Sequence, residues 1–500
     1  KYKTTPSNTP SIMSKRTTYD PKDYDPVLEV DENQGYKASK LHITSFAMPH
    51  MRSFHFAWLS FFVAFLGWFA LAPLMPVLKA DLGLTDADIY AANISSVAAT
   101  VVARFIVGPL CDRFGPKNIQ CILLLWGALC VSFATSITNA TGLIIVRLFI
   151  GVVGSAFVPC QYWATMLFTK EKAGTAQAIS GGWGNLGGGA PQFLLTAIYE
   201  GFLVNHSSST AWRLTMIVPA ALLVTVSVAM YFLSTDSPQG DFGNLIHAGT
   251  KKKVSATTSA RAGFSDPVAW VLCVQYAASF GVELTVNNTM TMYFKNNFTV
   301  SLLTASTIAS CFGLMNLFAR AMGGMLSDKA NQLIGMRGRL LVHMGVLLLE
   351  GIMLIIFSQM KELTAAIIVL IIFSIFTQCA EGATFALVPY VNPSATGAIA
   401  GIVGAGGNIG AVTWGTIFLV RSNQGLDAAG SFQIVGICVI IISLLSVFIF
   451  FKDDYDGIFC NPRRTNKFNS IRKGNASLEI PQAVDTSDVH VDQDDGNVEQ

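Results

Sequence analysis

The segment R-F-I-V-G-P-L-C-D-R, from Arg104 to Arg113, is matched 216 residues later by R-A-M-G-G-M-L-S-D-K, from Arg320 to Lys329. Each segment reads R-x3-G-x3-D followed by a cation, within apolar surroundings. If both are membrane-spanning helices, the arginine lies about 12 Å deeper than the aspartate, at roughly 1.5 Å per residue. A guanidinium there costs about 2.5–3.5 kcal/mol on insertion scales. A matched pair therefore predicts a buried site for an anion.

The composition is that of a membrane protein. Of 500 residues, 52% are hydrophobic and only 13% are charged, whereas soluble proteins have about 25% charged residues. Apolar runs of spanning length, about 20 residues each, begin near Phe54, Ile89, Asn118, Gly142, Gly174, Arg213, Phe264, Leu303, Leu340, Leu363, Ala395 and Ala428. We therefore expect an all-α integral membrane protein with twelve transmembrane helices in two pseudo-symmetric sets of six.

Polar stretches divide the chain into five parts. We expect a disordered N-terminal tail over residues 1–52, a six-helix bundle over 53–233, a central loop over 234–263, a second bundle over 264–452 and a disordered C-terminal tail over 453–500. Both tails lack the apolar residues that a packed core needs. The first apolar run is too long for a cleavable signal peptide, so we expect the N-terminal tail to stay in the cytosol.

Charges in the short loops predict the orientation. Eleven Lys and Arg residues lie on the side that shares the N terminus, and four lie opposite: Lys79, Lys295, Lys361 and Arg421. By the positive-inside rule, both termini and the central loop are cytoplasmic. The nine cysteines show neither a disulfide framework nor a zinc spacing.

A second repeat lies in two glycine-rich helices. An offset of 223 residues aligns three glycines and the asparagine of G-G-W-G-N-L-G, from Gly181 to Gly187, with those of G-A-G-G-N-I-G, from Gly404 to Gly410. The aligned residues are Gly181, Gly184, Asn185 and Gly187 with Gly404, Gly407, Asn408 and Gly410. The glycines favour close helix packing. An amide at mid-membrane depth is costly unless it is paired, so Asn185 and Asn408 are predicted to line the same site as the arginines; hydrogen bonding between helices is the alternative.

Two arginines in equivalent places of two repeats should face each other across the central cavity. Like charges repel there unless an anion lies between them, and a planar guanidinium suits a flat oxyanion. The alternative for Arg104 and Arg320 is a buried salt bridge to Glu350 or Glu381. Arg147 lies too close to the outer end for the central site and is assigned to structure.

The aspartates of the repeat are assigned to a gate. Asp112 with Arg113, and Asp328 with Lys329, are predicted to form ion pairs at the cytoplasmic surface that break when the cavity opens inward. Plain solvation in a loop is the alternative. Three further carboxylates, Glu283, Glu350 and Glu381, lie within apolar runs. They are candidates for carrying a coupling proton or for pairing with an arginine; Glu350 and Glu381 come out near mid-bilayer, and Glu283 toward the outer end.

The loop motif G-P-L-C-D-R-F-G-P-K, from Gly108 to Lys117, resembles the signature of the major facilitator superfamily. Within it, the chain resembles the nitrate/nitrite porters, and most closely the high-affinity nitrate transporters of plants, algae and fungi. The resemblance covers residues 54–451 and rests on the two arginines, the two glycine-rich segments and three further stretches: A-F-V-P-C-Q-Y-W from Ala156, Y-A-A-S-F-G-V-E-L from Tyr276 and E-G-A-T-F from Glu381.

The resemblance implies a nitrate site. It assigns nitrate to Arg104 and Arg320, and the lining to Asn185, Asn408, Gly184, Gly407, Tyr276, Phe280 and Phe157. It also implies import of nitrate, and of nitrite, by proton symport and alternating access for nitrate assimilation at the plasma membrane. The expected partners are the substrate, protons or sodium as the coupling ion, the lipid bilayer and an accessory single-span subunit, as in plant relatives. No cofactor and no nucleic acid is expected.

Three other functions remain open on the residues alone. The chain could carry another small anion, exchange nitrate for nitrite, or sense nitrate without net flux. A sensor usually needs an output module, and neither tail has the apolar content for one. An enzyme is not expected, because no arrangement of nucleophile, base and orienting residue and no metal-ligand spacing is present.

Overall fold

The computed structural model describes residues 26–247, 261–392, 396–451 and 457–459. Eleven helical spans among them are long and apolar enough to cross a membrane. The twelfth expected span is α7 (Lys170–Leu203), a helix of 34 residues whose glycine-rich sequence does not meet that criterion. The all-α membrane architecture expected from the sequence is confirmed.

The N-terminal half contains six spans, several of them broken by short 3₁₀ turns. Their elements are α1 (His50–Trp68), η4 (Ala72–Leu74), α2 (Met75–Leu82), α3 (Asp86–Phe114), α4 (Pro116–Phe133), α5 (Ala140–Gly151), η6 (Val152–Ala156), α6 (Phe157–Leu167), α7 and α8 (Ser208–Leu233). A short helix, α9 (Phe242–His247), follows in the central loop. Arg104 lies on α3.

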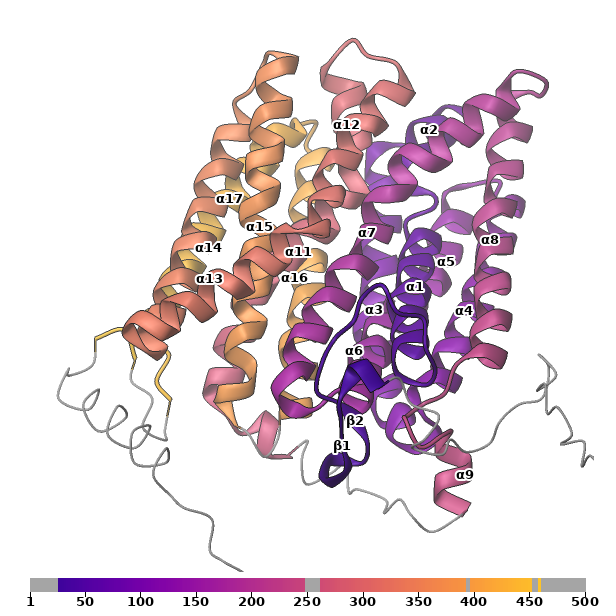
Figure 1. Cartoon of the computed structure of the whole chain (residues 1–500). Helices are drawn as coiled ribbons and strands as arrows, with labels where there is room; N and C mark the ends of the chain where they lie inside the picture. Colours follow the sequence, from indigo (N-terminus) through magenta and orange to yellow (C-terminus); the bar gives the residue numbers. More distant parts are fainter. Residues whose placement is uncertain (1–25, 248–260, 393–395, 452–456, 460–500) are drawn as a thin grey trace, which may run out of the picture.

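The C-terminal half repeats this plan. Its elements are α11 (Pro267–Asn297), α12 (Leu302–Leu314), η7 (Met315–Leu317), α13 (Ala319–Ile334), α14 (Met336–Ser358), α15 (Leu363–Val391), α16 (Thr396–Asn423), α17 (Ala428–Ser443) and η8 (Leu444–Phe448). Arg320 lies on α13, directly after the break at η7. Figure 1 shows this half, in orange and yellow, beside the N-terminal half in indigo and magenta.

Glycines hold equivalent helices close together in the two halves. A Cβ added at Gly187 of α7 would overlap the backbone of Phe62 on α1, and one at Gly410 of α16 would overlap the backbone of Ala277 on α11. These two glycines are related by the 223-residue offset. The packing role predicted for the glycine-rich repeat therefore has a structural counterpart, since small residues let helix backbones approach.

The N-terminal tail is ordered from residue 26 on, so the prediction of disorder over 1–52 is wrong for this part; residues 1–25 lie outside the described residues. Strands β1 (Val30–Asp31) and β2 (Lys37–Ala38) form an antiparallel hairpin. Ala38 pairs with Phe168 in an isolated bridge, and Lys37 Nζ donates to Thr165 O at 2.8 Å. The hairpin is stable because it packs on α6, which composition alone did not reveal.

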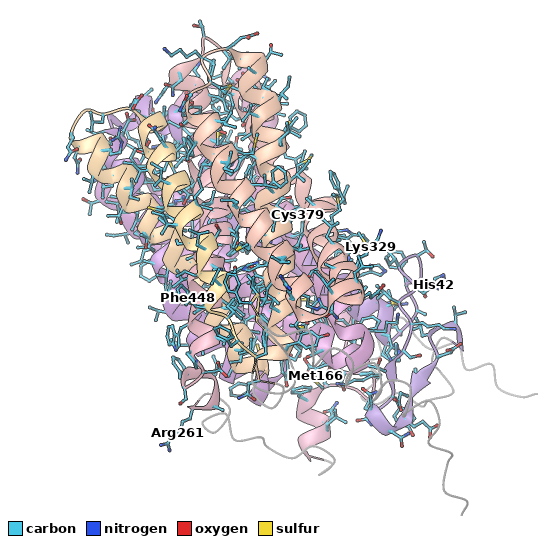
Figure 2. The ribbon with its side chains drawn as sticks, turned by 90° about the vertical axis from the view of Figure 1, so that its left-hand side faces the viewer. His42, Met166, Arg261, Lys329, Cys379 and Phe448 are labelled. Atoms are coloured by element: carbon cyan, nitrogen blue, oxygen red, sulfur yellow. The ribbon has the colours of Figure 1, made fainter. Side chains whose placement is uncertain are left out.

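The hairpin and α9 lie at the same end of the bundle (Figure 1), which we call the hairpin end, and the opposite end is the far end. Figure 2 places Lys329 nearer than Cys379 to the hairpin-end residue His42. Central-loop residues 234–247 are ordered as well: Asp236 is fully buried and accepts hydrogen bonds from the backbone N–H groups of Lys117 and Phe242. The rest of the predicted central loop, residues 248–260, lies outside the described residues.

Candidate functional site

Arg104 projects from α3 to the other half of the molecule. Its side chain is 6% exposed, and Nη1 donates to the carbonyl oxygen of Gly404 on α16 at 2.8 Å. Nη2 donates to the carbonyl oxygen of Gly154 at 3.3 Å, while Nε has no hydrogen-bond partner. Among the described residues no carboxylate pairs with Arg104. A buried positive charge therefore has only neutral partners.

Arg320 reaches across in the opposite direction, and its charge is paired. It is 5% exposed and forms an ion pair with Glu381 of α15. Nη2 also donates to the Tyr276 hydroxyl at 3.0 Å. The salt bridge considered as an alternative for the arginines is thus present for Arg320 in this structure, and not for Arg104.

Asn185 completes the surroundings of Arg320. With its amide oxygen turned toward the guanidinium, it accepts hydrogen bonds from Nη1 and Nη2, the latter at 3.2 Å. The opposite amide orientation would point the NH2 group of Asn185 at the N–H groups of Arg320, and both are donors. Asn185 lies on α7 in the N-terminal half, so Arg320, like Arg104, bonds to the half opposite its own. The site is built by reciprocal contacts across the interface between halves.

Two glycines related by the 223-residue offset lie beside the two guanidinium groups. A Cβ at Gly181 would lie 3.6 Å from Arg320 Nη1, and one at Gly404 would lie 3.8 Å from Arg104 Nη1. Gly404 contributes its carbonyl oxygen to the site, and a Cβ there would make only an ordinary van der Waals contact. The sequence alignment paired these glycines but did not assign them to the site; their symmetric pairing was the signal.

Aromatic rings lie against both guanidinium groups. Cζ of Arg104 is 5.1 Å from the ring centroid of Phe157 and 5.6 Å from that of Phe280. Cζ of Arg320 is 5.7 Å from the same Phe280 ring, which stacks on Tyr276 at 5.2 Å. A cation is attracted to a ring face within about 6 Å. The ring of Phe280 therefore lies against both guanidinium groups.

Sequence reasoning missed two further rings of the site. Phe385 contacts Phe157 and Tyr276 with centroid distances of 6.0 and 5.0 Å. Phe61 packs against Phe157 at 5.7 Å. A Cβ at Gly184 would overlap Phe61, just as one at Gly407 would overlap Phe280. Phe61 is thus the N-terminal counterpart of Phe280, and the symmetry of α1 and α11 could have identified it.

Asn408 is buried, and it is linked to Arg104 through a shared hydrogen-bond acceptor. Its Nδ2 donates to Gly404 O at 3.4 Å, the carbonyl that also accepts from Arg104, and its Oδ1 has no partner. The structure therefore brings together all nine residues predicted to line the site. Their binding of nitrate stays a prediction.

The structure describes the side chains of two of the four predicted gate residues, Asp328 and Lys329. Asp328 pairs with Arg339 of α14 at 2.7 Å, and not with Lys329 as predicted. Adjacent residues on a helix point in different directions, whereas Arg339 lies on the helix packed against α13. The ion pair therefore joins α13 to α14, and its role as a gate stays a prediction. The side chains of Asp112 and Arg113 lie outside the described part of the structure.

The three candidate carboxylates are all buried within the described residues. Glu283, Glu350 and Glu381 are each fully buried, and the carboxyl groups of Glu283 and Glu381 lie within hydrogen-bond reach of each other. The depth of Glu283 in the membrane stays a prediction.

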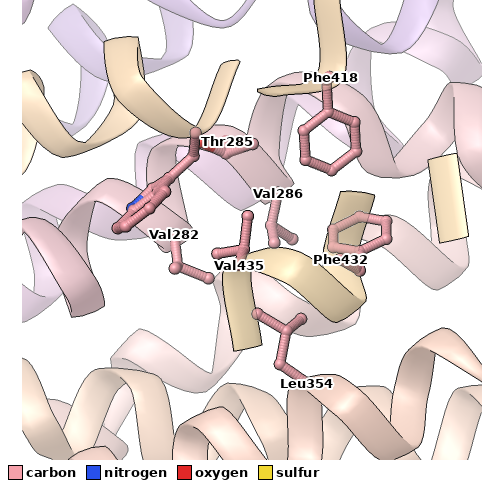
Figure 3. Close-up of a pocket in the computed structure, with 8 residues that line it drawn as sticks. Val282, Thr285, Val286, Leu354, Phe418, Phe432 and Val435 are labelled. Carbon is pink, nitrogen blue, oxygen red and sulfur yellow. The ribbon is translucent and has the colours of Figure 1, made fainter. Parts of the chain in front are cut away.

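A separate void lies between α11, α14, α16 and α17. It contains about 180 Å³ of space between atoms, which is not closed off and is too narrow for a water molecule. Its lining residues are Val282, Thr285, Val286, Leu354, Trp414, Phe418, Phe432 and Val435 (Figure 3). The hydroxyl of Thr285 donates to the carbonyl oxygen of Gly281 within its own helix. The lining offers no charge, so this void does not suit an anion.

Comparison with known proteins covers the whole bundle. A family model described as Major Facilitator Superfamily matches residues 57–415. High-affinity nitrate transporter 2.3 of Oryza sativa subsp. japonica is 36% identical over 441 residues, which are 88% of this chain and 85% of that protein. High affinity nitrate transporter 2.5 of Arabidopsis thaliana is 37% identical over 429 residues, 85% of this chain and 84% of that protein.

More distant likenesses extend the comparison. Nitrate/nitrite transporter NrtP of Picosynechococcus is 28% identical over 494 residues, covering 79% of this chain and 91% of that protein. A bacterial homolog of the human lysosomal transporter Spinster, in an inward-facing and unoccupied conformation, gives a TM-score of 0.58 at 14% identity over 79% of this chain and 95% of that one. Nucleoside transporter NupG gives 0.57 at 15%, over 79% and 98%. The structural likenesses concern the fold.

Proposed function

Because the chain belongs to the nitrate/nitrite porter family of the major facilitator superfamily, we propose that it carries nitrate, and also nitrite, into the cell by alternating access between its two halves. The plant and algal relatives are named as nitrate transporters. We place the hairpin end in the cytoplasm and the chain in the plasma membrane. The excess of Lys and Arg in the loops at that end supports this orientation.

One observation carries the proposal for the substrate. Two buried arginines, one from each half, lie against the ring of Phe280, and only one of them is paired with a carboxylate. Each also keeps a buried Nε–H without a hydrogen-bond partner among the described residues. A small planar oxyanion between them would supply both the missing charge and the missing acceptors, because guanidinium donates in a fork that fits such an anion.

Import of an anion needs a driving ion. Entry of nitrate into a negative cell is opposed by about 2.3 kcal/mol per 100 mV, so at least two cations must accompany each nitrate if the membrane potential is to drive the cycle. We propose protons, since three buried carboxylates lie beside the site. An accessory single-span subunit belongs to this proposal as a partner.

The test is a recording of currents in oocytes that express the chain alone, while nitrate, pH and sodium are varied independently. We expect an inward current that requires nitrate and grows as the external pH falls. A current that follows sodium instead of pH would overturn proton coupling. Absence of nitrate flux with the chain at the surface would overturn autonomous transport, and co-expression of a relative's accessory subunit separates a missing partner from a wrong substrate.

A further inference from the structure

Three carboxylates meet a single cation in the C-terminal half. Glu283 on α11, Glu350 on α14 and Glu381 on α15 are each fully buried, and within the described residues only Arg320 forms an ion pair with any of them. Burying an uncompensated carboxylate is very costly, so such a group keeps its proton instead. At least two of the three therefore hold a proton in this arrangement.

Each of the carboxyl groups of Glu283 and Glu381 has one oxygen with a hydrogen-bond donor and one oxygen without. Glu283 Oε1 accepts from Asn316 Nδ2 at 2.9 Å, and Glu381 Oε2 pairs with Arg320. The other oxygen of each has no donor as a partner, although the two carboxyl groups lie within hydrogen-bond reach. Two carboxylates are both acceptors, so a bond between them requires one proton, and two like charges at this distance do not both ionise.

Glu381 also competes with the anion. Arg320 uses Nη2 for Glu381 and Tyr276 and directs Nη1 and Nη2 to Asn185. An anion held by both arginines needs donors of Arg320 that now face Glu381. A protonated Glu381 is no longer a strong acceptor for a guanidinium, since charge-assisted bonds are about twice as strong as neutral ones.

We propose that Glu283 and Glu381 form a proton-sharing pair, and that uptake of one more proton by this pair releases Arg320 to the transported anion. The proton adds to a carboxylate oxygen of Glu381, the Arg320–Glu381 ion pair opens, and the anion takes its place. On the cytoplasmic side the proton leaves to water, and Glu381 recovers Arg320 as the anion departs. This rests on the proposed function and accounts for one of the coupling protons.

The groups that face this pair come from four helices. They are Arg320 of α13, Tyr276 of α11, Glu350 of α14 and, further off, Arg104 of α3. The side chains that α7 and α16 turn toward the site, Asn185 and Asn408, are neutral. Glu350 is fully buried and forms no ion pair within the described residues, so it stays protonated and does not compete for Arg320.

Two substitutions should act in opposite directions. Glu381→Gln removes the competing charge permanently, so Arg320 is free at every pH and nitrate affinity should be high and independent of pH. In Glu283→Gln the amide oxygen can accept from Asn316, as Glu283 Oε1 does, and the amide N–H groups then face Glu381 as permanent donors, which stabilise its ionised form on Arg320. Nitrate affinity should then fall, and its rise should move to lower pH. A residue with a merely structural role would not produce opposite signs.

The experiment measures nitrate exchange in liposomes at pH 5.5 and 7.5. In the wild type we expect the half-saturating nitrate concentration to decrease as the pH is lowered, by up to about ten-fold per pH unit in the range where protonation frees Arg320. Glu381→Gln should still exchange nitrate but should lose its response to an imposed pH gradient. Glu362→Gln is the matched control, because Glu362 is exposed at the start of the same helix.

Three results would overturn the proposal. They are a wild-type affinity that is equal at both pH values, a Glu381→Gln variant with the wild-type pH dependence, and two variants that change affinity in the same direction. If Glu381→Gln does not fold, the wild-type pH dependence and Glu283→Gln decide. If the wild type exchanges no nitrate at all, the proposed function fails, and this mechanism fails with it.

Discussion

Arg147 on α5 and Asn288 on α11 join the two halves toward the far end, where Arg147 Nη2 donates to Asn288 Oδ1 at 2.5 Å. Arg147 is fully buried, and it also donates to Asn93 and to the carbonyl oxygen of Trp68. A second link runs from Gln192 of α7, whose Nε2 donates to Asn287 O at 2.6 Å. The structural role predicted for Arg147 agrees with this arrangement.

We expect Asn288→Leu to shift the protein toward a state that is open at the far end. The substitution leaves a donor of buried Arg147 without its acceptor, which costs about 1.5–3 kcal/mol for a charged group. That is a shift of roughly ten-fold or more in the equilibrium between states. Spin labels at Ser136 and Lys361, exposed at the far end on different halves, should show a longer distance by electron resonance. An unchanged distance distribution would show that this bond does not hold the halves together.

Gly407→Ala should weaken nitrate binding while the protein still reaches the membrane. A Cβ at Gly407 would overlap the ring of Phe280, and this ring lies against both arginines. We expect a loss of affinity of about five-fold or more, since overpacking typically costs about 1–3 kcal/mol. Gly401→Ala on the same helix is the control, because a Cβ there meets nothing within 4 Å. Equal nitrate affinities in the two variants would contradict the role of Phe280.

Arg104→Lys and Arg320→Lys should each abolish nitrate uptake with surface expression intact. Lysine keeps the charge but not the planar fork that reaches Gly404 and Gly154 from Arg104, or Tyr276 and Asn185 from Arg320. The loss of one charge-assisted contact, about 3 kcal/mol at most, corresponds to roughly 100-fold in affinity. Arg421→Lys, in an ion pair at the surface, is the control. Normal uptake by either site variant would refute the arginine site.

The central site was predictable because its residues are chemically out of place in a membrane. Arg104, Arg320, Asn185 and Asn408 are polar groups in apolar runs, and the internal repeat alone is enough to pair them. Backbone groups could not be found in this way. The carbonyl oxygen of Gly404, which accepts from Arg104, exists at every residue, and only the helix packing selects it.

Pairings between distant segments were the part that sequence could not decide. Asp328 has a cation directly after it in the chain, yet it pairs with Arg339 eleven residues further on, because the helix packing brings these two together. The hairpin over residues 30–38 is held by α6, a partner more than 100 residues away.

The carboxyl group of Asp236, at the hairpin end, should make stability depend on pH. Burial raises the pKa of Asp236 to about 6 from its usual 3.8, although backbone N–H groups and Lys117 oppose the shift. Between these values the folded state holds the proton and the unfolded state has lost it. The free energy of unfolding therefore falls by about 1.4 kcal/mol per pH unit as pH rises from about 4 to 6, and it is level above that range.

Asp236→Asn should remove this slope, because an amide does not titrate. The measurement is the midpoint of thermal unfolding in detergent at several pH values between 4 and 7. Asp427→Asn, which changes an exposed carboxylate, should keep the wild-type slope. If Asp236→Asn also keeps it, the carboxyl of Asp236 is ionised throughout, and its hydrogen bonds with the Lys117 and Phe242 backbone outweigh the cost of its burial.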